Sequence, residues 1–163
     1  MTRIPARPQS LEDIEQWAQD VAQSLRVLEN RVLGPHPPNR WSFLSEDEVR
    51  DRIERDIGET ELTAAFHAMA FVEQKLRARL IDLLQDPTVI APASVESMTF
   101  EGLCDWWRKS GRASTPGALS EIKGWLEFRH WIAHGRWWSA AVPQVAAFHL
   151  IFSVCRRAVS ALP

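Results

Sequence analysis

The chain has 163 residues, of which 45% are hydrophobic and 25% are charged, and its formal net charge is −2. This composition is typical of one folded globular domain, and it excludes a disordered chain, a fibrous chain and a strongly basic nucleic-acid coat protein. We therefore expect a single domain over residues 1–163 that needs no disulfide or metal to fold. Cys104 and Cys155 lie far apart in apolar segments, which predicts reduced, buried thiols in a cytoplasmic protein.

No segment has the pattern of a membrane anchor. The opening residues MTRIPARPQS lack the apolar core of a secretion signal. The most apolar run, AAFHLIFSVC at residues 146–155, is shorter than the ~20 residues that cross a bilayer. We expect no membrane partner, and we expect this run to form a core or interface helix.

The first part of the chain predicts two helices separated by a proline-rich loop. Ser10 can cap a helix whose apolar residues recur at helical spacing until about Gly34. The segment GPHPPNR predicts a loop, because proline removes a backbone donor and restricts the residue before it. A capping box that begins at Ser45 predicts a short charged helix ending at Gly58.

The remaining chain predicts four further helices. Residues 60–85 carry a regular apolar stripe formed by Leu62, Phe66, Met69, Val72, Leu76, Leu80 and Leu84. Thr99 can cap a helix that ends at Gly111, and Thr115 with Pro116 predicts a helix to about His134. Pro143 begins the last helix, which runs to about Ala161.

No segment alternates polar and apolar residues as a half-buried strand does, so we predict no sheet. The expected fold class is all-α. It is an up-and-down helical bundle of four principal helices and one or two short ones.

The segment EFRHWIAHGRWW, residues 127–138, concentrates charges and aromatic rings. It holds two Arg, two His and three Trp in a chain with no Tyr. Residues 108–163 carry 8 Lys and Arg against 2 Asp and Glu, whereas residues 1–107 carry 11 against 19. The segment therefore lies in the basic part of a weakly acidic chain. Its Trp residues suit base stacking, although packing is the stronger interpretation for most of them.

Arg129, followed after four residues by His134 at the end of a predicted bundle helix, resembles the signature of the HEPN superfamily. His130 stands where many HEPN proteins have a polar residue after the Arg. The resemblance implies a helical bundle that is often dimeric. It also implies a metal-independent endoribonuclease without a cofactor, acting on single-stranded RNA in a toxin–antitoxin or antiphage setting, with an antitoxin protein as a further partner.

The chemistry of RNA cleavage without a metal needs the two residue types of this motif. The ribose 2′-hydroxyl is the nucleophile, so one group must take its proton and another must protonate the leaving oxygen. Histidine suits both tasks because its unperturbed pKa of ~6.5 lies near neutrality. Arginine stays charged and can bind two phosphate oxygens with its planar fork.

The spacing of Arg129 and His134 indicates a second copy of the chain. On a straight helix, five residues turn a side chain by about 140° and raise it by about 7.5 Å, so the two would not share a face. They converge if the helix loosens at His134, or if a twofold homodimer brings two copies of the pair into one cleft. The HEPN resemblance implies the dimeric arrangement.

Three neighbours are candidate supporting or RNA-binding residues. His130 can orient the reacting His or contact RNA, and Arg136 can bind phosphate. Glu73, in an otherwise apolar part of the long helix, can pair with Arg129, as acidic residues do in some HEPN proteins, or it can be a simple exposed side chain, which is the stronger interpretation. Some HEPN toxins carry a modifiable Tyr two residues after the motif His. Arg136 occupies that place here, which excludes control by modification of that Tyr.

Two other functions are compatible with the segment. Glu127, His130 and His134 have the three- and four-residue spacing with which one helix presents metal ligands. Alternatively, the chain is a non-catalytic helical adaptor, such as a HEPN-like partner subunit. In that case Arg129 pairs with an acidic residue and His134 interacts favourably with the end of its helix.

The metal hypothesis predicts a measurable metal content. If Glu127, His130 and His134 are ligands, elemental analysis of the purified protein should find zinc, iron or manganese near one equivalent. If the ribonuclease hypothesis holds instead, the protein should be free of these metals and should retain its activity in EDTA. A metal-free preparation would remove the metal site from consideration.

Overall fold

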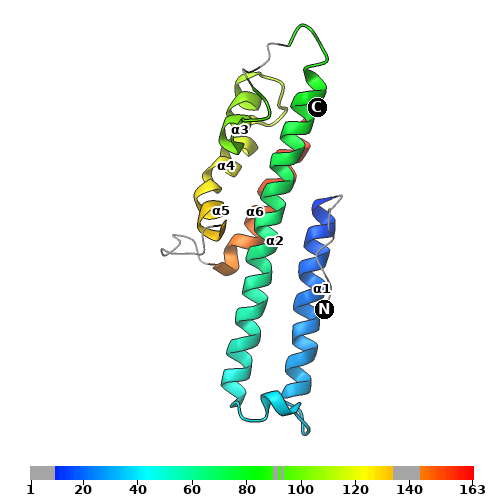
Figure 1. Cartoon of the computed structure of the whole chain (residues 1–163), viewed down its shortest axis with the longest axis vertical. Helices are drawn as coiled ribbons and strands as arrows, with labels where there is room; N and C mark the ends of the chain where they lie inside the picture. The colour runs from blue at the N-terminus through cyan, green and yellow to red at the C-terminus, as the bar shows by residue number, and fades with distance from the viewer. Residues whose placement is uncertain (1–9, 90–91, 93, 134–143) are drawn as a thin grey trace. The chain divides into compact units, whose positions relative to one another are not determined.

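Helices form all of the regular structure that the computed structural model describes (Figure 1). The description covers residues 10–89, 92, 94–133 and 144–163, without the side chains of residues 144–147. No β-strand occurs in these residues, so the predicted all-α class is confirmed. None of the helices within these ranges combines the length and the apolar character needed to cross a membrane.

The chain divides into two compact units, residues 1–64 and residues 65–163, with the division inside a long helix. The first unit contains α1 (Leu11–Val32), the short 3-10 helix η1 (Asn39–Trp41) and the start of α2 (Glu46–Leu83). The second unit contains the rest of α2 and helices α3 to α6. The prediction of one domain over residues 1–163 stays a prediction.

In the first unit, α1 packs beside the start of α2 (Figure 1). Its core contains the buried residues Val32, Trp41, Val49, Ile53 and Ile57, with Ala22, Leu25, Leu28, Leu33 and Leu44 packed around them. The predicted caps are present at both helix starts. Ser10 accepts a hydrogen bond from the Asp13 amide at 3.1 Å, and the Ser45 amide donates to Glu48 at 2.8 Å.

The helix that begins after Ser45 does not end at Gly58, and this part of the prediction was wrong. It continues as α2 for 38 residues, so the predicted short helix and the predicted long helix are one. A single glycine costs about 1 kcal/mol in a helix interior, which is less than the apolar contacts on both sides of it contribute. A Cβ placed at Gly58 would meet no atom within 4 Å, so no close contact requires glycine there.

The second unit is a helical bundle of α2 with four shorter segments. These are α3 (Phe100–Lys109), α4 (Pro116–Gly124), α5 (Leu126–Ala133) and α6 (Gln144–Ser160). α4 packs against α3, α5 and α6. The side chain of Trp107 in α3 is fully buried and donates from Nε1 to the Leu76 carbonyl of α2 at 3.1 Å. Trp107 therefore joins α3 to the apolar stripe of α2.

The prediction of one helix from Pro116 to about His134 was wrong, because residues 116–133 form two helices. α4 ends at Gly124, and Trp125 separates it from α5. The Trp125 amide donates to the Ile122 carbonyl at 3.0 Å, a tight turn that interrupts the α-helical pattern. Glycine is a weak helix former, and here it is the last residue of α4. His134, the predicted end of this helix, lies outside the described residues.

Ion pairs and hydrogen bonds hold α3, α4 and α6 together. Lys123 of α4 contacts Glu101 at 2.8 Å and Asp105 at 3.1 Å, both in α3. The hydrogen bond from Lys123 lowers the pKa of Asp105, so this carboxylate stays charged at neutral pH. The amide of Ser114, just before α4, donates to the Ala161 carbonyl after α6 at 2.8 Å.

Two glycines should respond in opposite ways to alanine. Gly58→Ala should raise the free energy of unfolding by about 0.5–1 kcal/mol, because alanine lowers the backbone entropy of the unfolded chain and has room here. Gly111→Ala should lower it by about 1–2 kcal/mol, because Gly111 has a φ of +67°. Urea titration followed by circular dichroism measures both. A loss of stability in Gly58→Ala would contradict an uninterrupted α2.

Candidate functional site

Arg129 of α5 is bound to Glu73 of α2. Its Nη2 donates to Glu73 Oε2 at 2.8 Å, and the two side chains are 29% and 23% exposed. The local turn places Arg129 in the first turn of α5, where its amide donates to the Trp125 carbonyl at 3.0 Å. Of the two alternatives that the sequence left open for Glu73, an exposed side chain or a partner of Arg129, the structure shows the pairing, although the two residues are 56 positions apart in the sequence.

Two phenyl rings border the Arg129 guanidinium. The guanidinium carbon lies 5.6 Å from the ring centre of Phe66 in α2 and 5.5 Å from that of Phe100 in α3. At these distances the quadrupole of each ring attracts the cation, by about 0.5–2 kcal/mol depending on desolvation. Arg129 is thus held by groups from α2 and α3 while it projects from α5.

Glu73 has a second cationic partner in Arg77, one turn further along α2. Arg77 Nη2 lies 3.3 Å from Glu73 Oε1 and 2.7 Å from the Met98 carbonyl. Arg77 Nη1 also donates to the carbonyls of Val95 and Glu96. The carboxylate therefore bridges two guanidinium groups, and Arg77 binds the segment that leads into α3. We call Glu73, Arg77 and Arg129 the Glu73 cluster.

One donor of the Glu73 cluster is unsatisfied. The Nε–H of Arg129 is buried and has no hydrogen-bond partner among the residues that the structure describes. A buried donor in this state costs about 1–3 kcal/mol, and the attraction to the two rings offsets part of that cost. The cluster also keeps an excess of positive charge, because two guanidinium groups face one carboxylate.

The other predicted site residues fall into two groups. His130 is exposed on α5 next to Arg129, and Glu127 is exposed one turn earlier. His134 and Arg136 lie outside the described residues, as do Trp137 and Trp138, for which packing and base stacking were both considered. The structure therefore describes the surroundings of Arg129 but not those of His134. Whether Arg129 and His134 act together stays a prediction.

The aromatic residues of α5 pack inside the second unit. Trp131 is buried and stacks with Phe128 at a centroid distance of 5.5 Å. Trp125 contacts Phe128 edge to face at 5.8 Å. These contacts agree with the interpretation that packing explains Trp125 and Trp131.

Sequence reasoning missed three residues of the site. Arg77 lies four residues after Glu73, a spacing that predicts an ion pair on one helix face, and this signal could have been used. Phe66 was assigned to the apolar stripe, and nothing in its sequence spacing distinguishes a residue that contacts Arg129 from one that only packs in the core. Phe100 lies directly after the Thr99 cap, and no local pattern marks its contact with an arginine.

No thiol in the chain is prepared for nucleophilic chemistry. Burial raises the pKa of Cys104 to about 12 and that of Cys155 to about 12. Both are free and buried, as predicted, and both stay protonated at neutral pH. His67 of α2 is partly buried, and desolvation lowers its pKa, which favours the neutral imidazole. Within the described ranges no three His, Cys, Asp or Glu side chains gather as metal ligands would.

Comparisons of the chain with protein-family models, with curated proteins and with solved structures found no match in any of the three. The HEPN resemblance accordingly rests on the motif at Arg129 and His134 and on the all-α class, and it stays a prediction.

Removing the charge of Glu73 should destabilise the second unit. Glu73→Gln leaves Arg77 and Arg129 partly buried and facing each other without a carboxylate, which should lower the free energy of unfolding by about 1–3 kcal/mol. Chemical denaturation monitored by tryptophan fluorescence measures this loss. The matched control is Glu121→Gln, because the ion pair of Glu121 with Arg157 is about half exposed on both sides and should contribute less than about 1 kcal/mol. If both variants lose the same free energy of unfolding, the Glu73 cluster stabilises the protein no more than an exposed ion pair does.

Proposed function

We propose that this protein is a metal-independent endoribonuclease of the HEPN type that cleaves single-stranded RNA. Arg129 and His134 are the catalytic pair, and a twofold homodimer assembles the cleft. The setting that fits such an activity is a bacterial toxin controlled by an antitoxin protein, or an antiphage defence effector. No cofactor takes part.

The observation that carries the proposal is the way in which Arg129 is held. Its guanidinium is anchored by Glu73 at 2.8 Å and bordered by Phe66 and Phe100, yet the side chain is 29% exposed. A cation held in this way loses little freedom when a phosphate arrives, which is what electrostatic stabilisation of a transition state requires. The excess positive charge of the Glu73 cluster supports the same role.

The proposed reaction is an attack by the ribose 2′-oxygen on the adjacent phosphorus. One imidazole takes the proton of the 2′-hydroxyl, the bond from phosphorus to the 5′-oxygen breaks, and a second imidazole protonates the departing 5′-oxygen. The products are a 2′,3′-cyclic phosphate and a free 5′-hydroxyl. Arg129 binds the phosphate oxygens, whose negative charge increases in the transition state. Two His134 side chains, one from each protomer, provide the base and the acid.

Support for His130 and Arg136 comes from their position in the motif segment. His130 is exposed and follows Arg129 directly, and in this proposal it orients a reacting group or contacts RNA. Arg136 follows the motif and provides a further cation for the RNA backbone.

A second candidate function is a non-catalytic helical adaptor. The observation that favours it is that Arg129 already has a carboxylate partner in Glu73 and two ring contacts. These interactions explain an arginine at this position by structure alone. Under this proposal His134 has no chemical role, and the protein binds another macromolecule through its helical surface.

Substitution of the two motif residues separates these functions. Arg129→Ala and His134→Ala should each lower the cleavage of a single-stranded RNA oligonucleotide in EDTA by about 10²-fold or more. An oligonucleotide with 2′-O-methyl groups should resist the wild-type protein, because it lacks the nucleophile. Gel electrophoresis of end-labelled RNA measures the rates, and far-ultraviolet circular dichroism checks that the helices remain.

His134→Ala is the decisive variant, because Arg129→Ala also breaks the ion pair with Glu73. His149→Ala, at an exposed position of α6, is the matched control and should cleave as the wild type does. Unchanged cleavage in both motif variants would reject the site. If expression of the wild type does not arrest bacterial growth and no RNA is cut, the adaptor function holds. Growth arrest that depends on His134 counts against the adaptor.

A further inference from the structure

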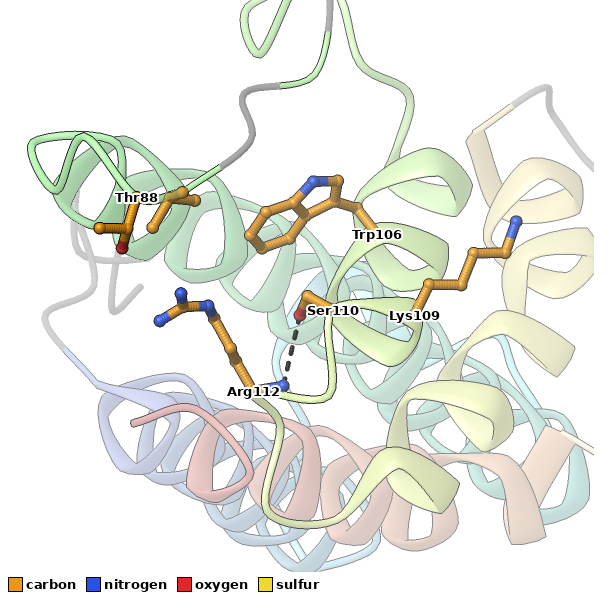
Figure 2. A pocket seen from close by; sticks show the side chains of 6 residues that line it. Thr88, Trp106, Lys109, Ser110 and Arg112 are labelled. Atoms are coloured by element: carbon orange, nitrogen blue, oxygen red, sulfur yellow. Dashed lines mark hydrogen bonds between the residues drawn. The ribbon is translucent and has the colours of Figure 1, made fainter.

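A second feature of residues 65–163 lies away from the motif, at the end of α3. Thr88, Val89, Trp106, Lys109, Ser110 and Arg112 line a hollow of about 390 Å³, which we call the Trp106 pocket (Figure 2). Small-molecule sites in proteins have volumes of roughly 300–1,000 Å³. The Trp106 ring and the Arg112 guanidinium extend toward Thr88, whereas the Lys109 side chain extends the other way (Figure 2).

The end of α3 forms this pocket through its capping residues. Gly111 has a φ of +67°, so the chain turns back directly after the Ser110 cap and brings Arg112 beside the last turn of the helix. The Arg112 amide donates to Ser110 Oγ at 3.4 Å, as drawn in Figure 2, and Ser110 Oγ donates to the Trp107 carbonyl at 2.9 Å. On the facing segment, the amide and hydroxyl of Thr88 donate to Asp86 at 2.9 and 2.7 Å.

The Trp106 pocket is lined by an indole with a free face and by cations that form no ion pair with a described residue. Trp106 is partly exposed, and its one ring contact within the described part of the chain, with Trp107, is edge to face at 5.3 Å, which occupies at most one face of its indole. Arg112 and Lys109 form no ion pair with any residue in the described ranges. By contrast, the neighbouring cations Arg108 and Lys123 both contact Asp105. Hydrogen bonds from Thr88 lower the pKa of Asp86, and the nearby charge of Arg112 lowers it slightly further, although the Asp86 and Arg112 side chains form no ion pair.

We propose that the Trp106 pocket binds a nucleotide unit, with a nucleobase stacked on the indole of Trp106 and its phosphate bound by Arg112. An indole face supplies the sequence-tolerant stacking surface that a base needs. The planar guanidinium of Arg112, which has no carboxylate partner among the described residues, supplies two parallel donors for phosphate oxygens. The Thr88 hydroxyl, whose proton is used by Asp86, still has lone pairs that accept from the amino groups of a base.

This inference stands beside the proposed ribonuclease activity and does not depend on it. The pocket consists of residues that take no part in the motif, and its ligand can be a free mononucleotide or one nucleotide of an RNA strand. Both sources present the same chemistry, namely a planar base with an adjacent phosphate. Binding is measured without cleavage, so a failed binding test leaves the cleavage test unaffected.

Binding is tested on the full chain by titration with defined probes. AMP added to ¹⁵N-labelled protein should shift the Trp106 indole N–H signal saturably, with the signal assigned through Trp106→Phe. Adenosine alone and inorganic phosphate alone should each bind about tenfold or more weakly, because each keeps only one of the two contacts. A fluorescent 2′-O-methyl oligouridine, which cannot be cleaved through its 2′-position, measures strand binding by anisotropy.

Two variants and one matched control identify the contacts. Arg112→Gln should weaken AMP binding by about tenfold or more, and it should reduce the salt dependence of oligonucleotide binding by about 0.7 in the log–log slope. Trp106→Leu should weaken binding at least about fivefold. Arg108→Gln removes the same charge from the same helix end but leaves the pocket lining intact, so it should bind as the wild type does. If Trp106→Leu does not fold, the Arg112 variant decides the test.

Each outcome has a defined meaning. Saturable binding of AMP that depends on Arg112 supports the site, and strand binding in addition identifies RNA as the source of the nucleotide. Binding of AMP without strand binding identifies a free nucleotide. The proposal is overturned if AMP does not shift the Trp106 signal at concentrations on the order of 10 mM, where even a millimolar Kd would be evident, and the oligouridine shows no anisotropy change that depends on Arg112. It is also overturned if phosphate binds as well as AMP, or if Arg108→Gln weakens binding as much as Arg112→Gln.

Discussion

A carboxylate shared by two guanidinium groups is the interaction on which the arrangement of residues 65–163 depends. Glu73 binds Arg129 at 2.8 Å and Arg77 at 3.3 Å, and Arg77 continues to the Met98 carbonyl at 2.7 Å. Partly buried charges are costly unless each has a partner, so these contacts are favourable only in one arrangement of α2, α5 and the segment before α3. The Glu73 cluster therefore specifies how these elements meet, in addition to the apolar packing.

The same contacts connect the structure to the proposed chemistry. An arginine that must stabilise a phosphate has to be held in place before the substrate arrives, and the groups that hold it cannot consume all of its charge. In the Glu73 cluster, one carboxylate partly neutralises two guanidinium groups, and the flanking rings leave the cation charged. Arg129 can therefore be held in place by Glu73 and the two rings and still offer positive charge to a phosphate, as the proposed reaction requires. His134 carries no such structural duty in the proposal, which makes it the more informative residue to substitute.

The distribution of cations in residues 65–163 distinguishes structural positions from candidate binding positions. Arg77, Arg108, Lys123, Arg129 and Arg157 all contact carboxylates within this unit. Lys109 and Arg112 have no such partner among the described residues, and Arg112 lies next to a partly exposed indole. A paired cation stabilises the fold, whereas an unpaired cation beside an aromatic face can still bind the anionic group of a ligand. The motif segment and the Trp106 pocket are therefore separate hypotheses with separate physical grounds.

The sequence by itself determined the features that depend on near neighbours. These include the all-α class, the caps at Ser10, Ser45 and Thr99, the apolar stripe of α2 and the end of α3 just before Gly111. Each follows from backbone groups and side chains within one or two turns, where spacing is a sufficient guide. Only the tertiary structure decided that the helix continues through Gly58 and that another breaks at Gly124. A glycine shifts the balance by about 1 kcal/mol, so packing from distant residues determines the outcome. The Glu73–Arg129 contact was one option among several in the sequence, because partners 56 positions apart meet only when the helices between them pack.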